Sequence, residues 1–287
     1  MTPAIPTWTT LVDAPTLAAA IAAESLVLID CRAQLADPSA GARLHAQGHL
    51  PGAIHADLER DLSDMTRSGQ GRHPWPRTDA FARTLGRWGV TPHTQVVAYD
   101  ADTGMYAARA WCLLHLFGHR RVAVLDGGLA AWLKAGFALE TRMPDPVAAA
   151  PYPGDFDRAR LFDHDDVGAH LVHGGLLLDA RAAERFRGEV EPIDAVAGHV
   201  PGALNRPFAT NLDSDGRFKS PVELFAEFAE LSAGRTPADV VAMCGSGVTA
   251  CHHLLAMAHA GLHGARLYPG SWSGWISDPA RPVATGG

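Results

Sequence analysis

The feature that most constrains the fold of this 287-residue chain is a series of motifs that occurs twice. Internal repeats indicate that a chain is built from copies of one structural unit. Four motifs recur in the same order in the two halves, so we expect two copies of one domain in tandem. The matched pairs are Leu28–Arg32 with Leu177–Arg181, Gly48–Ala53 with Gly198–Ala203, Val96–Asp100 with Val240–Cys244, and Gly127–Trp132 with Gly270–Trp275.

Each half alternates short runs of β-branched residues and leucine with longer amphipathic segments, such as residues 105–117 and 222–231. This alternation is typical of an α/β domain in which helices flank a mainly parallel sheet. Between the halves, residues 141–153 contain four prolines, which break regular structure. The expected parts are a first domain over residues 1–140, a linker over residues 141–155 and a second domain over residues 156–287.

Composition excludes several classes of function. The formal net charge is −7, whereas a nucleic-acid-binding surface needs an excess of basic residues. No apolar run is long enough to span a membrane. The first ten residues carry two prolines and no basic cluster, so we expect no secretory signal and a cytoplasmic protein.

The cysteines and histidines do not have the spacing of a metal site. Four cysteines are present, and in a cytoplasmic protein they are expected as free thiols. His252, His253 and His259 are the other residues that could bind a metal, but their spacing on a helix makes this the minor alternative. We expect neither a metal nor a cofactor. The cysteines are Cys31, Cys112, Cys244 and Cys251.

Cys244 is the strongest candidate for a reactive residue. It follows the apolar run Val240–Met243 and precedes a glycine-containing loop and a helical stretch. Such a loop directs backbone N–H groups and the positive end of a helix towards the sulfur, which favours the thiolate. The alternative is a buried cysteine that acts as a small hydrophobic residue. Gly245 and Gly247 favour the reactive interpretation, and ligands of parallel sheets bind beyond the carboxyl ends of the strands.

The repeat also provides an internal control, because a feature shared by both copies serves the common fold. The Asp-x-Arg pairs and the Gly-His turns are shared, so we assign them to ion pairs and turn-fixing hydrogen bonds. Three features lack a counterpart: Cys244 aligns with Asp100, Arg185 aligns with Ala36, and the segment 57–77 has no equivalent in the second half. The shared residues are Asp30, Arg32, His49, Asp179, Arg181 and His199.

The motifs together resemble the tandem-domain rhodanese family of sulfurtransferases, over nearly the whole chain. The resemblance implies a catalytic cysteine in the second domain, here Cys244, and an inactive first domain. Thiosulfate-specific members typically have a basic pair after the cysteine, whereas mercaptopyruvate-specific members have Gly-Ser or Gly-Thr. Gly245 and Ser246 match the second kind. The implied sulfur donor is therefore 3-mercaptopyruvate, with thiosulfate as the alternative.

The resemblance also implies a two-step reaction. Cys244 takes the donor sulfur as a persulfide while pyruvate leaves, and a thiol, a reduced thioredoxin or cyanide then accepts the sulfur. The loop amides, from Gly245 through Gly247 and Val248 to Thr249, would stabilise the anionic sulfur.

Similar enzymes use a serine–histidine–acid relay, and three residues of this chain match its positions. Ser246 and His73 match the serine and the histidine. Glu59 matches the acid best, and Asp57 and Asp61 remain open as alternatives. Considered alone, His73 would be interpreted as an exposed loop residue beside prolines. Its place in the segment without a counterpart favours a role in the relay instead.

An arginine of the family holds the donor carboxylate, and Arg185 matches it. A second family arginine commonly lies nine residues later, where this chain has Asp194. Arg187 or Arg206 could replace it from another direction. Cys251 lies within the helix after the loop, where a core role is expected rather than a disulfide with Cys244.

Two other classes of function compete with sulfur transfer. Phosphatases with a similar cysteine loop need an arginine six residues after the cysteine, and that position holds Ala250. A non-catalytic sulfur-carrier or binding module would be expected to have lost its cysteine, and Cys244 is present.

Overall fold

The computed structural model describes residues 6–287, and these divide into two compact units. The first unit contains residues 6–63, 76–156 and 214–217, and the second contains residues 64–75, 157–213 and 218–287. The segment 64–75 comes from the first half of the sequence but belongs to the second unit. This assignment matters because the segment carries His73.

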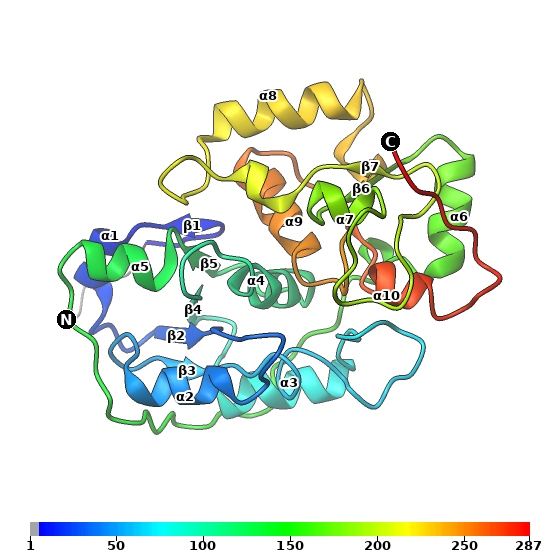
Figure 1. The fold of residues 1–287 in the computed structure, drawn as a ribbon. Coiled ribbons are helices and arrows are strands. Elements are labelled where there is room, and N and C mark those ends of the chain that lie inside the picture. The colour runs from blue at the N-terminus through cyan, green and yellow to red at the C-terminus, as the bar shows by residue number, and fades with distance from the viewer. Residues whose placement is uncertain (1–5) are drawn as a thin grey trace. The chain divides into compact units, whose positions relative to one another are not determined.

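The first unit is a parallel sheet flanked by helices (Figure 1). Its described residues form five strands in the order β1-β5-β4-β2-β3, and each pairing is parallel. In chain order the elements are β1 (Leu11–Val12), α1 (Ala14–Ala20), β2 (Leu26–Asp30), α2 (Ala40–Gln47), β3 (Ile54–His55), α3 (Thr78–Arg87), β4 (Gln95–Tyr99), α4 (Ala107–Leu116), β5 (Val122–Leu125) and α5 (Gly128–Lys134).

Both faces of this sheet are covered, which explains the unbroken apolar run of β4. Leu28, Val97 and Tyr99 point to one face and pack with Leu17 of α1 and Trp132 of α5. The intervening strand residues point to the opposite face, because side chains alternate along a strand. Helix α4 packs against β4 and β5. A strand buried on both sides loses the alternation of polar and apolar residues.

The second unit repeats the topology of the first. Its described strands lie in the order β7-β6-β8-β9, all parallel, which corresponds to β3-β2-β4-β5 of the first unit. The predicted pair of α/β domains with mainly parallel sheets is therefore confirmed. The elements are η1 (Arg158–Arg160), α6 (His164–Val172), β6 (Leu176–Asp179), α7 (Ala183–Phe186), β7 (Leu204–Asn205), η2 (Phe208–Asn211), α8 (Pro221–Ser232), η3 (Pro237–Asp239), β8 (Val240–Met243), α9 (Ala250–His259), β9 (Arg266–Leu267) and α10 (Ser271–Trp275).

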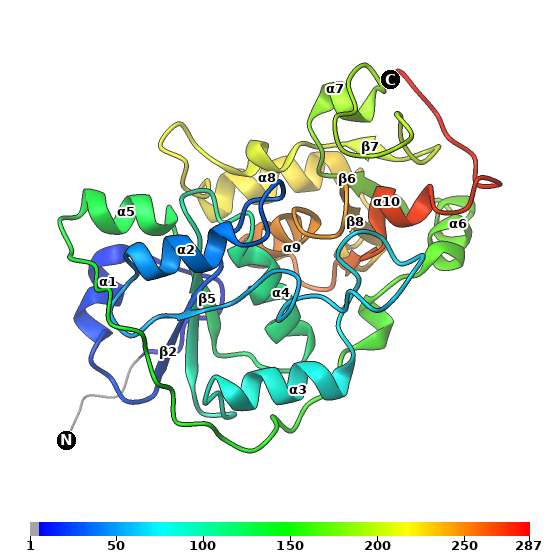
Figure 2. The ribbon, with the colours of Figure 1, turned by 60° about the horizontal axis from the view of Figure 1, so that its bottom comes forward.

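The core of the second unit holds β8 between helices. Leu177 of β6 and Met243 of β8 pack with Val167 of α6 and Trp272 of α10. Helix α9 packs against β8 and β9, and α8 packs against α9 (Figure 2). Since β8 ends at Met243, Cys244 is the first residue beyond the carboxyl end of a central strand, as the sequence predicts.

A buried Asp–Arg pair joins the end of a central strand to the Gly-His turn in each unit. Arg32 Nη2 lies 2.5 Å from Asp30 Oδ2 and donates to the carbonyl of Gly48 at 2.7 Å. These contacts agree with the structural role expected from the repeat. The second unit has the same contacts, at 2.7 and 2.8 Å, among Arg181, Asp179 and Gly198.

The turn histidines also make the same kind of contact in both units. His49 Nδ1 donates to the carbonyl of His45 at 2.7 Å, and His199 Nδ1 donates to that of Phe186 at 2.8 Å. A carbonyl can only accept, so each of these ring nitrogens carries its proton. Both histidines are buried, and their hydrogen bonds hold the turns in place as expected.

Candidate active site

Cys244 begins a loop that ends where α9 starts at Ala250. Its carbonyl oxygen accepts a hydrogen bond from the N–H of Trp272 at 2.9 Å, and the carbonyl of Gly245 accepts one from Ser273, also at 2.9 Å. Both donors belong to α10. The start of the loop is therefore fixed to a second element, and Cys244 is held in a position where it is only 2% exposed.

Ser271 supports the backbone of Cys244 directly. Its Oγ accepts from the N–H of Cys244 at 3.0 Å and donates to the carbonyl of Tyr268 at 2.9 Å. Ser271 has a φ of +51°, a left-handed conformation that is strained for a residue with a side chain. Gly128 has the matching position in the first unit, with a φ of +55°. Sequence reasoning missed Ser271, although the change from glycine to serine within a matched motif was the available signal.

Gly247 is required by the path of the loop. Its φ is +76°, and a Cβ atom on it would lie 2.4 Å from the carbonyl oxygen of Pro269. The neighbouring atoms are backbone, so no side-chain rotation could remove the contact. The expectation that glycine allows a close backbone approach near Cys244 thus fits the geometry at this position.

The loop has backbone donors available for an anion. Within residues 6–287, the N–H groups of Ser246, Val248 and Thr249 hydrogen-bond to no other protein atom. Free N–H groups between a strand and the start of a helix form a typical anion-binding arrangement.

The matching loop of the first unit surrounds a carboxyl group. Asp100 follows β4 as Cys244 follows β8, and its carbonyl accepts from the N–H of Leu129 at 2.9 Å. The Asp100 carboxylate accepts hydrogen bonds from the N–H groups of Gly104 at 2.9 Å, Tyr106 at 2.8 Å and Ala107 at 3.2 Å. Burial raises the pKa of Asp100, and these three donors act in the opposite direction. The position at the end of the strand therefore binds a carboxyl group through backbone N–H groups in one copy of the domain.

Ser246 and His73 lie in direct contact, as the sequence analysis expects. His73 Nδ1 is 2.8 Å from Ser246 Oγ, and both side chains are buried. The segment 64–75 brings His73 to this place and runs beside α10, where the N–H of Arg72 donates to Ser273 Oγ at 3.0 Å (Figure 2). A hydroxyl paired with an imidazole can pass a proton, and here the pair adjoins the residue after Cys244.

The three candidate acids belong to the first unit. Asp57 accepts from the N–H groups of Glu59 at 3.0 Å and Arg60 at 2.9 Å. Asp61 is buried and accepts from the guanidiniums of Arg60 at 2.8 Å and Arg87 at 2.9 Å. Glu59 as the acid that supports His73, with Asp57 and Asp61 as alternatives, stays a prediction.

Arg185 lies beside the start of the Cys244 loop. A Cβ atom on Gly245 would be 3.6 Å from Arg185 Nη1 and 3.7 Å from Nη2. Glu191 orients the guanidinium through contacts at 2.7 and 3.2 Å. Burial would raise the pKa of Glu191, but hydrogen bonds from Arg185 and from the backbone hold it below its ordinary value. The predicted substrate-binding arginine is thus a fixed cation next to the loop.

Arg72 is a second cation at the loop, and sequence reasoning did not find it. Its Nη2 would lie 3.1 Å from a Cβ atom on Gly245. Its Nη1 forms an ion pair with Asp194, and the same carboxylate accepts from Arg185 Nη2 at 3.1 Å. Burial raises the pKa of Asp194, and the guanidinium of Arg72 opposes that rise. The signal was present in the sequence, since Arg72 precedes His73 in the segment without a counterpart.

The two arginines that could replace the second family arginine contact other groups. Arg187 pairs with the exposed Glu189 at 2.7 Å. Arg206 pairs with Glu227 at 2.8 Å and lies over the ring of Phe228. The loop itself carries no charged side chain, and the positive charge beside it comes from Arg72 and Arg185 of other segments.

All four cysteines are free and buried. Cys251 lies in α9, and its Sγ donates to the carbonyl of Gly247 at 3.3 Å, which agrees with a core role. Cys31 is fully buried, and burial raises the pKa of its thiol well above the ordinary value.

Residues 6–287 contain no group of three or more His, Cys, Asp or Glu side chains that could hold a metal ion. His252 and His253 instead both accept from the amide of Asn211 at 2.9 Å. None of the described helices is long and apolar enough to cross a membrane.

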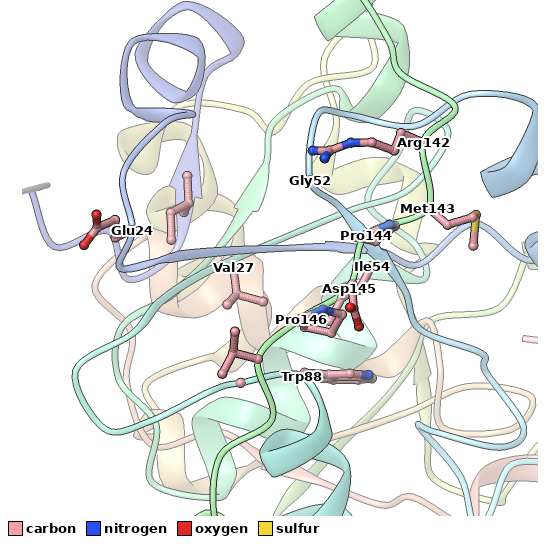
Figure 3. Close-up of a pocket in the computed structure, with 13 residues that line it drawn as sticks. Glu24, Val27, Gly52, Ile54, Trp88, Arg142, Met143, Pro144, Asp145 and Pro146 are labelled. Carbon is pink, nitrogen blue, oxygen red and sulfur yellow. The ribbon is translucent and has the colours of Figure 1, made fainter.

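The first unit has a pocket of about 510 Å³ beside β2 and β3 (Figure 3). The segment 142–147 forms one side, and Trp88 and Glu24 contribute to the other. Its lining has no cysteine, serine or histidine. The lining residues are Glu24, Leu26, Val27, Gly52, Ile54, Trp88, Gly89, Arg142, Met143, Pro144, Asp145, Pro146 and Val147.

Comparison with known proteins identifies similar chains. The family model of the rhodanese-like domain matches residues 13–135 and 163–278, one match in each half. A probable 3-mercaptopyruvate sulfurtransferase from Pseudomonas aeruginosa is 52% identical over 279 residues, which cover 96% of this chain and 98% of the relative. A putative thiosulfate sulfurtransferase, SseB, from Mycobacterium tuberculosis is 42% identical over 96% of this chain and 97% of its own length.

A solved structure shows the same arrangement of the fold. SseA from Escherichia coli, described as a 3-mercaptopyruvate sulfotransferase, superposes with a TM-score of 0.77 at 34% identity. The match covers 93% of this chain and all of that protein.

Proposed function

Because the chain belongs to the rhodanese-like family and carries two copies of its domain, we propose that it is a sulfurtransferase that takes sulfur from 3-mercaptopyruvate. Cys244 is the proposed nucleophile. The observation that carries the choice of donor is the 2.8 Å contact between Ser246 Oγ and His73 Nδ1, since Ser246 lies two residues after Cys244. This pair can deliver a proton, and the departure of pyruvate requires one.

In the first step the Cys244 thiolate attacks the donor sulfur. A sulfur–sulfur bond forms as the carbon–sulfur bond of the donor breaks, and the electrons of that bond leave with pyruvate as its enolate. The Ser246 hydroxyl protonates the enolate, and His73 supplies a proton to Ser246 in turn. Glu59 is the proposed acid that orients His73.

The loop stabilises the sulfur anion during this step. Its N–H groups, from Gly245 through Gly247 and Val248 to Thr249, are the proposed donors to the thiolate and the persulfide. The support comes from the N–H groups of Ser246, Val248 and Thr249, which have no protein acceptor within residues 6–287, and from the carboxyl group that backbone N–H groups bind at the matching position in the first unit. Asp100 is no sulfur nucleophile, so the first domain is proposed to be catalytically inactive.

In the second step an acceptor removes the outer sulfur. A thiolate, from a small thiol or a reduced thioredoxin, attacks the persulfide, and Cys244 leaves as the thiolate. Cyanide would act in the same way and yield thiocyanate. We propose that the reaction takes place in the cytoplasm, where reduced thiols are plentiful.

Thiosulfate is the alternative donor. Arg72 and Arg185 near Gly245 would suit its two negative charges, and the relative from Mycobacterium tuberculosis bears the name of a thiosulfate enzyme. Its leaving group, sulfite, needs no proton. The buried Ser246–His73 pair therefore favours 3-mercaptopyruvate.

The test is to expose the protein to 3-mercaptopyruvate without an acceptor and to locate the added sulfur by mass spectrometry. We expect an adduct of one sulfur atom on Cys244, absent from Cys244→Ser. Cys251→Ala is the matched control, since it removes another buried thiol of the same region, and it should still form the adduct. Failure of the wild-type protein to form any adduct would refute the proposal and favour a non-catalytic binding module.

The choice of donor is tested in the same preparation. We expect a higher kcat/KM with 3-mercaptopyruvate than with thiosulfate in side-by-side steady-state assays. The reverse order would identify thiosulfate as the donor and leave the role of Cys244 intact.

A further inference from the structure

The two guanidiniums beside Cys244 come from segments far apart in the sequence and meet at one point. Arg72 Nη2, Arg185 Nη1 and Arg185 Nη2 all lie within 3.7 Å of the place where a Cβ atom of Gly245 would be. Gly245 directly follows Cys244, so this point adjoins the reactive sulfur. The absence of a side chain on Gly245 leaves the space in front of both guanidiniums open.

Asp194 holds the two cations side by side. One of its carboxylate oxygens pairs with Arg72 Nη1, and the other accepts from Arg185 Nη2 at 3.1 Å. The Asp194 side chain is only 4% exposed, so its charge is well shielded from water. Two like charges in such a place would repel each other, and a shared carboxylate offsets that repulsion. Glu191 fixes the far side of Arg185.

Each guanidinium keeps a donor free, and that donor is the one nearest to Gly245. In the part of the chain that the structure describes, Arg72 Nη2 and Arg185 Nη1 hydrogen-bond to no protein atom. They are also the nitrogens of their side chains that come closest to the Gly245 position, at 3.1 and 3.6 Å. Two such donors match the two oxygens of a carboxylate, which guanidiniums bind with directed hydrogen bonds.

We propose that Arg72 binds the carboxylate of the sulfur donor together with Arg185, for which the family resemblance already implies this role, and that Asp194 positions both. The inference rests on the proposed transfer of sulfur from a carboxylate-bearing donor. Asp194 cannot bind a carboxylate directly, because both groups are negatively charged. Its proposed role is to hold Arg72, which comes from another segment. Arg72 thereby supplies the cation that position 194 lacks.

The first test compares two donors that differ only in the carboxylate. Mercaptoacetone has the thiol and the carbonyl group of 3-mercaptopyruvate but is neutral. Arg72→Gln is expected to raise KM for 3-mercaptopyruvate roughly 10- to 100-fold and to leave KM for mercaptoacetone unchanged. Arg67→Gln is the matched control, because Arg67 lies in the same segment and donates to the carbonyl of Trp75 at 3.0 Å. It should leave the ratio of the two KM values as in the wild type.

The second test exchanges the charges. Arg72→Asp and Asp194→Arg each place two like charges together and should each raise KM for 3-mercaptopyruvate. The double variant restores an ion pair and returns a guanidinium to the loop, so its KM should recover by at least tenfold relative to either single variant. If Arg72 only shapes the segment 64–75, the double variant should not recover in KM.

The outcomes separate this inference from the proposed function. An equal rise in KM for both donors in Arg72→Gln, or no change in KM for either, would overturn the role of Arg72. Sulfur loading of the wild-type protein would still support the proposed sulfur transfer. If Arg72→Gln does not fold, Arg72→Lys keeps the charge and loses the paired donors. A rise in KM for 3-mercaptopyruvate alone would then support the proposal, and an unchanged KM would contradict it.

Discussion

Substitution of Gly247 by alanine tests whether the loop after Cys244 has only one backbone path. The left-handed φ of +76° costs about 1–2 kcal/mol for a residue with a Cβ atom. The added atom would also lie 2.4 Å from the carbonyl oxygen of Pro269, a contact that a side-chain rotation cannot relieve. Overpacking of this kind costs typically about 1–3 kcal/mol, so Gly247→Ala should lower the free energy of unfolding by about 2–5 kcal/mol.

Gly234→Ala is the matched control for that variant. Gly234 has a similar φ of +84°, but no atom lies within 4 Å of its Cβ position. Only the conformational cost should remain, about 1–2 kcal/mol. Urea unfolding of both variants gives the difference, which we expect to be about 1–3 kcal/mol.

The same pair of variants separates stability from activity. Gly247→Ala should slow the formation of the Cys244 persulfide, because its added atom displaces the loop whose N–H groups face the sulfur anion in our proposal. Gly234→Ala should load sulfur at the wild-type rate. Equal losses of stability in the two variants would refute the reasoning about the contact with Pro269, and normal loading by Gly247→Ala would refute its consequence for the site.

Two further predictions concern histidines. His73→Ala is expected to lower kcat/KM for 3-mercaptopyruvate by roughly 10²- to 10⁴-fold and that for thiosulfate far less, since sulfite leaves without a proton; equal losses would contradict the proton relay. Burial lowers the pKa of His253 from 6.5 to about 3, so its contribution to stability is complete above pH 6.5 and is lost as the pH falls towards 3. At pH 5 this loss is about 2 kcal/mol. Burial also lowers the pKa of His45, His119, His164 and His259, so both proteins should lose stability between pH 7 and pH 5, and urea unfolding should show a loss that is larger by about 2 kcal/mol in the wild type than in His253→Gln.

The order of the elements could be predicted because it depends on local patterns. The amphipathic segments 105–117 and 222–231 correspond to α4 and α8. Helix α8 also carries its own start signal: Ser220 accepts from the N–H of Glu223, and the Glu223 carboxylate accepts from the N–H of Ser220. The repeat then predicted that the two halves share one topology, because the same motifs occur in the same order in both.

The partners of the site residues could not be predicted from local patterns. The contact between His73 and Ser246 spans 173 positions and was expected only from the resemblance to a family. Arg72 was overlooked because its partner, Asp194, is 122 positions away. Asp194 considered alone suggested a lost cation, and only its two ion pairs reveal that it holds Arg72 of a distant segment and Arg185 nine residues before it. Such long-range contacts depend on the three-dimensional fold and produce no local pattern in the sequence.

The two units have different residues at the ends of the matching strands β4 and β8. At the end of β4, burial raises the pKa of the Asp100 carboxyl group, and hydrogen bonds from the N–H groups of Gly104, Tyr106 and Ala107 act against that rise. The fold thus directs backbone N–H groups to this point before any catalytic residue is added. At the end of β8, Cys244 brings a sulfur atom to the same point. On our proposal, the second copy needed few changes to become reactive: a thiol in place of a carboxylate, a serine at 271 to hold its N–H, and cations at the loop to bind the donor.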